Sequence, residues 1–207
     1  MHLGRHFLAG CLAAVTVLVA GCASEEQIGG AIGDVNKEFQ AEYETILAQQ
    51  GTRIYKLGQA AAFSGVRSAL IGLGMTVETQ DQDLGYLNFY AAAPRPLDRD
   101  EWRRAAETDL PRMREIARKR VGMMSDFIRF EPEGLQIVIN ATMLEVKSGT
   151  EISLTMRMRE VAPPKSGMPR REYAPPTGVR MGLDKIWRAI DHELSAAGGA
   201  SSLRPQF

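Results

Sequence analysis

The sequence predicts an α+β fold in which an antiparallel sheet of about five to six strands has one face covered by two amphipathic helices. Apolar and polar side chains alternate over 135–143 and over 152–158, which is typical of strands with one face in a core and the other in water. Apolar residues recur every three or four positions over 63–73 and 179–194, which indicates helices with one apolar face. Packing these helices on the apolar side of the sheet buries both patterns at once.

The first 21 residues are predicted to be a signal peptide. A basic residue precedes an apolar core over 7–19, which has the length of a signal-peptide core and is too short to span a bilayer. The core runs into Val-Ala-Gly-Cys at 19–22, which resembles the lipobox of bacterial lipoproteins. The resemblance implies cleavage between Gly21 and Cys22, with a diacylglycerol and an N-acyl chain attached to Cys22. We expect no other cofactor.

The residues around the cysteine predict where the protein resides. Cys11, the second cysteine, falls in the cleaved segment, so Cys22 has no disulfide partner in the mature chain. Ala23 and Ser24 follow it. The sequence here resembles lipoproteins sorted by the rule of enteric bacteria, in which an aspartate after the cysteine retains the protein in the inner membrane, and this chain lacks that aspartate. We therefore expect a lipid anchor in the outer membrane, with the protein on the periplasmic face.

The first half of the mature chain is predicted to begin with a tether. Residues 22–33 are small and polar with three glycines, which favours a flexible segment, and a single domain is expected over 34–197. Asp34 is placed to cap a helix that ends near Gly51. A strand over 52–57, a helix over 63–73, and strands over 75–79 and 86–91 are expected to follow.

The second half contains a charged insert and a proline-rich loop. Residues 98–121 are predicted to form a helical insert that Pro111 divides into two short helices. The proline-rich residues 162–177 are expected to form a loop that cannot join the sheet. Strands over 127–131, 135–143 and 152–158, a last helix over 179–194 and a flexible tail over 198–207 complete the prediction.

One stretch of the domain resembles a known family. The pattern is a helix, a strand, an acidic turn with glycine, and a second strand; its residues are Phe63, Val66, Leu70, Gly74, Val77, Asp81, Gly85 and Leu87. It resembles the helix-grip domains of bacterial lipoproteins, two of which occur in the C lipoprotein of the outer-membrane β-barrel assembly machinery. The resemblance implies a helix-grip-like fold that has no catalytic residues and works by protein contact.

The charge balance excludes one class of partner. The chain has 25 basic and 25 acidic residues, and the signal segment contains a single basic residue, Arg5, and no acidic one. The mature protein is therefore almost neutral, whereas a nucleic-acid-binding protein needs a basic excess to neutralise phosphates. His192 is the sole histidine outside the signal segment, so no multi-histidine metal site is expected.

The sequence predicts no enzyme. Ser64 lacks the glycine-flanked turn that exposes a serine nucleophile, and His192 has no partner that marks it as a base. Asp81 and Asp83 lie in a predicted turn without the further oxygen ligands that calcium requires. Each of these residues has a simpler structural interpretation.

A run of positive charge is the strongest candidate for a binding site. The run consists of Arg112, Arg114, Arg118, Lys119 and Arg120, with Glu115 as the one acidic residue among them. It is either a solvated helix face or a docking surface for an acidic partner, an anionic lipid headgroup or the cell-wall polymer. Trp102 is either an aromatic anchor for the same partner or a core residue.

These observations favour a non-enzymatic lipoprotein that binds another envelope protein, as an accessory to outer-membrane assembly. The alternative is a periplasmic carrier whose sheet and last helix enclose a lipid or another apolar ligand. The carrier hypothesis depends on Met75, Met143, Met156 and Met158, which lie on predicted strands and adapt to varied shapes. The sequence leaves the oligomeric state open.

Overall fold

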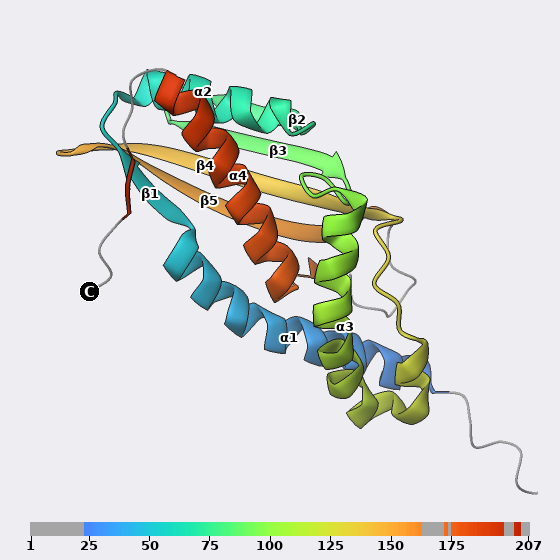
Figure 1. Ribbon diagram of the computed structural model, residues 1–207. Coiled ribbons are helices and arrows are strands. Elements are labelled where there is room, and N and C mark those ends of the chain that lie inside the picture. Colours follow the sequence, from blue (N-terminus) through green and yellow to red (C-terminus); the bar gives the residue numbers. More distant parts are fainter. Residues whose placement is uncertain (1–22, 163–171, 174, 197–200, 204–207) are drawn as a thin grey trace, which may run out of the picture.

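The computed structural model describes residues 23–162, 172–173, 175–196 and 201–203 (Figure 1). The helices are α1 (Glu25–Gln50), α2 (Gln59–Gly72), α3 (Arg99–Val121) and α4 (Pro176–Ala196), with a 3-10 helix, η1 (Gly122–Phe127), directly after α3. The strands are β1 (Thr52–Tyr55), β2 (Thr76–Asp81), β3 (Tyr86–Ala92), β4 (Leu135–Val146), β5 (Gly149–Glu160), β6 (Glu172–Tyr173) and β7 (Ser201–Leu203).

All strand pairs of the sheet are antiparallel. The order is β2-β3-β4-β5-β1-β7, and β6 pairs with the last residues of β5. Strands β4 and β5 form the central hairpin, which is in register from Leu135 opposite Glu160 to Val146 opposite Gly149. Strands β6 and β7 are short additions of two and three residues. The predicted α+β fold with an antiparallel sheet is confirmed.

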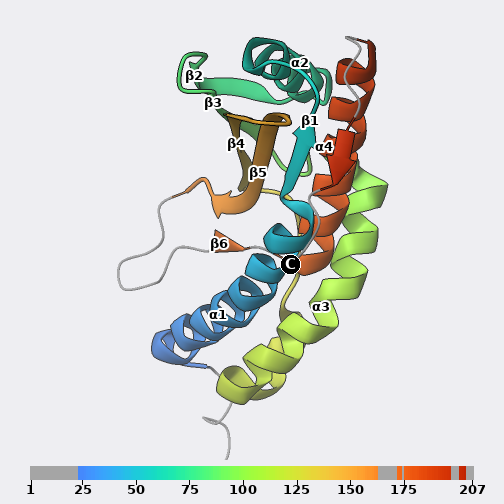
Figure 2. The same ribbon diagram turned by 90° about the vertical axis from the view of Figure 1, so that its left-hand side faces the viewer.

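Helices α2 and α4 contact each other and cover one face of the sheet (Figures 1 and 2). On β4, Ile137 and Ile139 are fully buried beneath them, whereas Val138 between the two is half-buried. The helices approach the sheet closely: a Cβ added to Gly182 of α4 would lie 2.3 Å from the Sδ of Met156 on β5. Two amphipathic helices therefore cover the apolar face of the sheet, as the alternating pattern predicts.

Helices α1 and α3 pack against each other and extend beyond the sheet (Figure 2). We call the part that consists of residues 25–42, residues 109–121 and η1 the arm. Its apolar contact surface is small; it consists of Ala31, Val35 and Phe39 on α1 and Met113, Ile116 and Ala117 on α3, all buried. The arm and the sheet meet where α1 and α3 both contact α4.

The flexible tether predicted over 22–33 is wrong for residues 25–33, which form the first turns of α1. Ser24 accepts a hydrogen bond from the backbone N–H of Gln27, and the Gln27 side chain accepts one from the N–H of Ser24. This capping box satisfies donors that would otherwise be free at the helix start. Gly30 lies against the side chain of Arg120, 3.5 Å from where its Cβ would be, so α3 supports these turns.

The charged segment 98–121 is one helix and not the predicted pair. Asp98 caps it through a second capping box with Glu101. Pro111 inside the helix has no N–H for the carbonyl of Glu107, but Glu107 is exposed, so water can hydrogen-bond that carbonyl. Buried residues on both sides of Pro111, from Trp102 to Ala117, hold the two halves in line.

Three further predictions are corrected. No strand forms over 127–131, because Phe127 ends η1 and is 76% exposed while Phe130 is buried. The proline-rich segment 162–177 was predicted to stay outside the sheet, but its residues 172–173, which are not prolines, pair with β5 as β6. In the predicted tail, residues 201–203 pair with β1 as β7.

Candidate partner-binding surface

All five cations of the run 112–120 contact polar groups of the protein itself. The pairs are Arg112 with Glu42, Arg114 with the carbonyl of Ile128, Arg118 with Ser125 and Asp126, Lys119 with Glu38, and Arg120 with Asp34. The sequence is compatible with a solvated face or a docking surface for this run. The structure adds a third role, because the run joins α3 to α1 and to the segment that follows α3.

Three acidic residues of α1 face the run. Asp34, Glu38 and Glu42 are four positions apart, so they lie along one side of the helix. The Nε of Arg120 lies 2.8 Å from an Asp34 carboxylate oxygen, and the Nζ of Lys119 lies 3.7 Å from Glu38. The hydrogen bond from Arg120 lowers the pKa of Asp34. These two pairs and the pair of Arg112 with Glu42 make three, and we call them the ladder.

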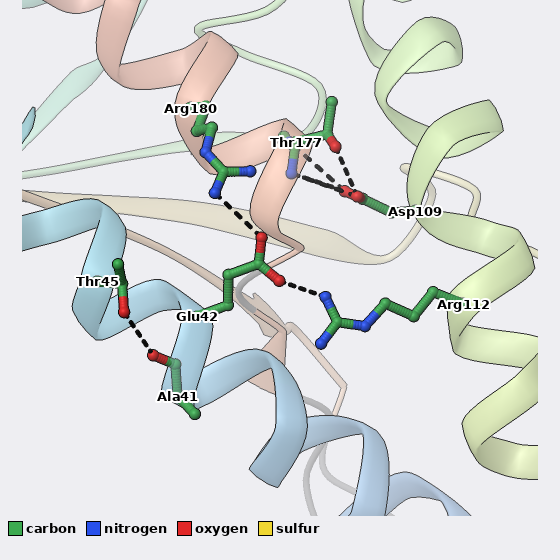
Figure 3. A network of polar contacts seen from close by, with 8 residues as sticks. Ala41, Glu42, Thr45, Asp109, Arg112, Thr177 and Arg180 are labelled. Atoms are coloured by element: carbon green, nitrogen blue, oxygen red, sulfur yellow. Dashed lines mark hydrogen bonds and ion pairs between the residues drawn. The ribbon is translucent and has the colours of Figure 1, made fainter. Parts of the chain in front are cut away.

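Glu42 joins three helices at the base of the arm (Figure 3). One of its carboxylate oxygens accepts a hydrogen bond from Arg112 of α3, and the other accepts one from Arg180 of α4 at 3.0 Å. Partial burial acts to raise the pKa of Glu42, but the two arginine hydrogen bonds outweigh it, and the net pKa is lowered. This carboxylate is therefore ionised at neutral pH and ties α1 to both neighbours.

Asp109 of α3 caps the first turn of α4 (Figure 3). Its carboxylate accepts hydrogen bonds from the Thr177 hydroxyl at 2.7 Å, from the Thr177 N–H at 3.0 Å and from the Gly178 N–H at 3.4 Å. Burial raises the pKa of Asp109 against these hydrogen bonds. The sequence held a signal for this residue that was missed: an aspartate within the apolar helical spacing Trp102, Ala105, Asp109, Met113.

Arg114 and Arg118 hold the chain that follows α3. The Arg114 guanidinium donates to the Ile128 carbonyl at 2.9 and 3.2 Å. Arg118 donates to the hydroxyl of the fully buried Ser125 at 3.3 Å and to Asp126. These two arginines therefore fix η1 against the end of α3.

Trp102 is a core residue. Its side chain is buried, its ring stacks on Phe130 with 4.8 Å between centroids, and its Nε1–H donates to the Phe130 carbonyl at 3.2 Å. An indole whose N–H already has an internal acceptor gains little from a partner. The core interpretation of Trp102 is correct, and Trp102 does not lie on an open surface.

A second polar cluster joins β1 to α4 and was not found from the sequence. Asp191 accepts hydrogen bonds from Tyr55 at 2.6 Å and from Arg53 at 2.7 Å. The Arg53 guanidinium also lies 4.7 Å above the Trp187 ring. Burial, and then the contact with Asp191, raises the pKa of Tyr55. The cluster is a structural tie between strand and helix.

The other residues singled out in the sequence are exposed, lie in a turn, or fall outside the described residues. Gly21 and Cys22 lie outside the described residues. Ser64 and His192 are exposed, and Asp81 accepts a hydrogen bond from the Leu84 N–H within the β2–β3 turn. Across the described ranges, no three His, Cys, Asp or Glu side chains are placed to hold a metal ion. None of the described helices is both long and apolar enough to cross a membrane.

The chain was compared with protein-family models, curated proteins and solved structures, and none of them matches it.

Proposed function

We propose that this protein is a non-enzymatic lipoprotein, anchored in the outer membrane through Cys22, that binds another envelope protein on its periplasmic side. The observation that carries the anchor is the lipobox at 19–22 after an apolar signal core. Ala23 and Ser24 after the cysteine support sorting to the outer membrane.

The sheet face opposite α2 and α4 supports the binding role, because no described element covers its centre. Tyr86, Asn88 and Tyr90 of β3 and Val138 and Asn140 of β4 are half-buried on this face. We call these five residues the open face. Tyrosine and asparagine are adaptable contact residues, and tyrosine is frequent at protein interfaces.

One side chain of the open face, Asn88, is only partly hydrogen-bonded within the described residues. The Asn88 side-chain nitrogen donates to Glu78 at 2.9 Å, but its oxygen is shielded from solvent and has no partner among the described residues. A shielded acceptor without a donor is costly, so Asn88 stabilises the sheet less than a fully hydrogen-bonded side chain would. By contrast, Asn140 is satisfied by Tyr86 and Thr155.

The basic run supports the proposal less than the open face does. Its five cations already contact groups of α1, η1 and Ile128, so a partner would have to displace these contacts. Such exchange costs what the internal pairs contribute. The partner surface is therefore proposed on the sheet and not on the run.

The carrier alternative has weaker support. Three of the strand methionines that suggested it, Met143, Met156 and Met158, are buried against the protein's own helices. Met156 fills the space beside Gly182, and the Cε of Met158 lies 3.4 Å from the Cβ position of Gly178. Core packing accounts for these side chains.

The anchor is tested in cells that produce the full chain. Metabolic labelling with a palmitate analogue is expected to label the wild-type protein, and Cys22→Ala is expected to remove the label and release the protein from the membrane fraction. A Cys11→Ala variant is the matched control and keeps both properties. Firm membrane association of Cys22→Ala would refute the anchor.

The partner is tested by photo-crosslinking from single positions of the full-length protein. A benzoyl-phenylalanine in place of Tyr86 or Tyr90 is expected to capture one envelope protein, whereas the same group at the exposed Gln49 of α1 captures none. Capture from Gln49 alone, or from no position, contradicts the open face as the binding surface. A lipid adduct at Tyr86 or Tyr90 would favour the carrier.

A further inference from the structure

The 3-10 helix η1 presents large apolar side chains to solvent at the end of the arm. Met123 is 85% exposed, Phe127 is 76% exposed and Met124 is 42% exposed, all within six residues. We call these three residues the tip. Single exposed apolar residues are ordinary on protein surfaces, but three in one short turn form a patch that marks an interaction site.

The tip is held in place by its polar neighbours. Arg118 binds Ser125 and Asp126 between the apolar residues, and Arg114 binds the Ile128 carbonyl just beyond them. Ser125 is fully buried, so the turn is fixed on its inner side while its methionines and phenylalanine point outward. Gly122, with φ of 56°, ends α3 and begins this turn. The exposure is therefore built into the fold.

The tip lies beside the start of α1, where the lipid anchor is proposed. Figures 1 and 2 show η1 next to the N-terminal end of α1, and Arg120 at the end of α3 is bonded to Asp34 of α1. Cys22 is two residues before Ser24, the cap of α1, a separation that the chain can span by at most about 7 Å. Ile28, in the first turns of α1, is also 38% exposed. A membrane that holds the acyl chains of Cys22 is thus close to the tip.

We propose that the tip is a second membrane contact, which inserts Met123, Met124 and Phe127 into the boundary between headgroups and acyl chains of the membrane that holds Cys22. The proposal rests on the lipidation proposed above. An anchor alone leaves a protein free to rotate about its tether, whereas an anchor and an apolar tip on the same end fix the direction of the arm. The arm then holds the sheet and its open face away from the bilayer (Figure 2).

The charges around the tip indicate that the contact is apolar and not electrostatic. Arg118, Lys119 and Arg120 have side chains that are 59%, 68% and 54% exposed, but they are paired with Asp126, Glu38 and Asp34. Glu25 and Glu26 add negative charge at the first turn of α1. With no basic excess, the tip does not select anionic lipids. We expect insertion into zwitterionic membranes and little dependence on salt.

The test uses the full-length lipoprotein in phosphatidylcholine vesicles, with single cysteines at the tip. The introduced thiol is the free one, because the sulfur of Cys22 is consumed by the lipid. An environment-sensitive NBD fluorophore on Phe127→Cys or Met123→Cys is expected to shift to shorter wavelength and to be quenched by doxyl-labelled lipid. Leu84→Cys in the β2–β3 turn is the matched control, since Leu84 is an apolar residue 72% exposed at the other end of the sheet. Its fluorophore is expected to stay accessible to iodide.

The outcomes separate this proposal from the one it rests on. Failure of the protein to float with vesicles, with no acyl mass on Cys22, refutes lipidation. Flotation with tip fluorophores as accessible to iodide as the one at Leu84 overturns the membrane contact. Protection that depends on protein concentration and not on lipid identifies a second copy as the occupant and also overturns it.

A second test removes the apolar side chains on either side of the labelled position Met124. In the double variant Met123→Ser and Phe127→Ser, a fluorophore at Met124→Cys is expected to lose at least about half of its quenching by doxyl lipid, because the apolar area that drives insertion is gone. Circular dichroism of the variant is expected to match wild type, since both residues are exposed. Unchanged quenching would show that apolar insertion does not hold the tip.

Discussion

The sheet with α2 and α4 buries almost wholly apolar side chains, whereas the arm sets the carboxylates of α1 against the cations of α3. Ile139 of β4 and Leu183 and Ile186 of α4 are fully buried. In the arm, the pairs of Lys119 with Glu38 and of Arg120 with Asp34 remain largely exposed. Apolar burial is strong and non-directional, while exposed ion pairs are weak and depend on pH and salt. The two regions should therefore respond differently to the same kinds of change.

The largest effect is expected in the sheet region, from Trp187→Ala. Trp187 is 1% exposed, stacks on Tyr55 and donates to the Gln50 carbonyl at 2.7 Å. Its removal leaves a large cavity and should lower the free energy of unfolding by about 3–5 kcal/mol. Urea unfolding followed by circular dichroism measures the change. A loss below about 1 kcal/mol would contradict the assignment of the core.

Asp109→Ala tests the joint between the two regions. The substitution removes the acceptor of three donors at the start of α4, and loss of a helix cap costs about 0.5–2 kcal/mol. Asp109→Asn is the control, since its amide oxygen still accepts one of these hydrogen bonds, and it should lose less. The midpoints of urea unfolding compare the two variants. An Asp109→Ala variant as stable as wild type would show that the carboxylate does not act as the cap.

Glu42→Gln tests the pH dependence of the ladder. The pKa of Glu42 is lower in the folded than in the unfolded protein, so its stabilisation is present above about pH 4.5 and is lost as the pH falls through the folded value. At pH 7 the variant should be less stable by about 1 kcal/mol or less, because the pair is partly exposed. Once the pH is below the folded pKa of Glu42, the difference from wild type should vanish. A difference that persists there would assign the effect to shape and not to charge.

Arg120→Ala is expected to have the smallest effect. The pair with Asp34 is exposed, so the midpoint of urea unfolding should remain that of wild type. Local opening is more sensitive, and the amide protons of residues 25–33 should exchange faster with deuterium because the first turns of α1 lose contact with α3. Arg103→Ala, on the exposed side of α3, is the matched control and should leave this exchange unchanged. Equal exchange in both variants would show that Arg120 does not support these turns.

The same contrast explains what the sequence could predict. In β4 and β5, each residue's burial follows from its own position in an alternating pattern, so Ile137 and Met156 could be placed in the core without knowing their neighbours. The arm depends on pairs of residues that are far apart in the sequence. Nothing near Arg112 indicates that Glu42, 70 residues earlier, binds it, and Asp34 is 86 residues from Arg120.

Some wrong predictions arose where two features of the sequence pointed to different structures. The glycines at 29, 30 and 33 favoured a flexible tether, although Ser24 and Gln27 have the spacing of a capping box. Pro111 favoured a break that its helix tolerates. Cys22 is identified by its surroundings in the sequence alone, and its lipidation stays a prediction. The alternating pattern predicted a sheet face in water, but it could not show which residues of β3 and β4 lie together as the open face, because that depends on the pairing of the strands.

The cap that Asp109 supplies to Thr177 has a consequence for the assembly of the chain. Helix α4 begins with Pro176, and the side chain that satisfies its first free N–H groups belongs to α3, 68 residues earlier. The docking of α3 therefore stabilises the first turn of α4. A shortened protein that keeps the sheet, α2 and α4 but lacks residues 98–121 would have no side chain to cap α4, and the first turn of α4 would fray. The charged segment is therefore part of the folding unit of the domain.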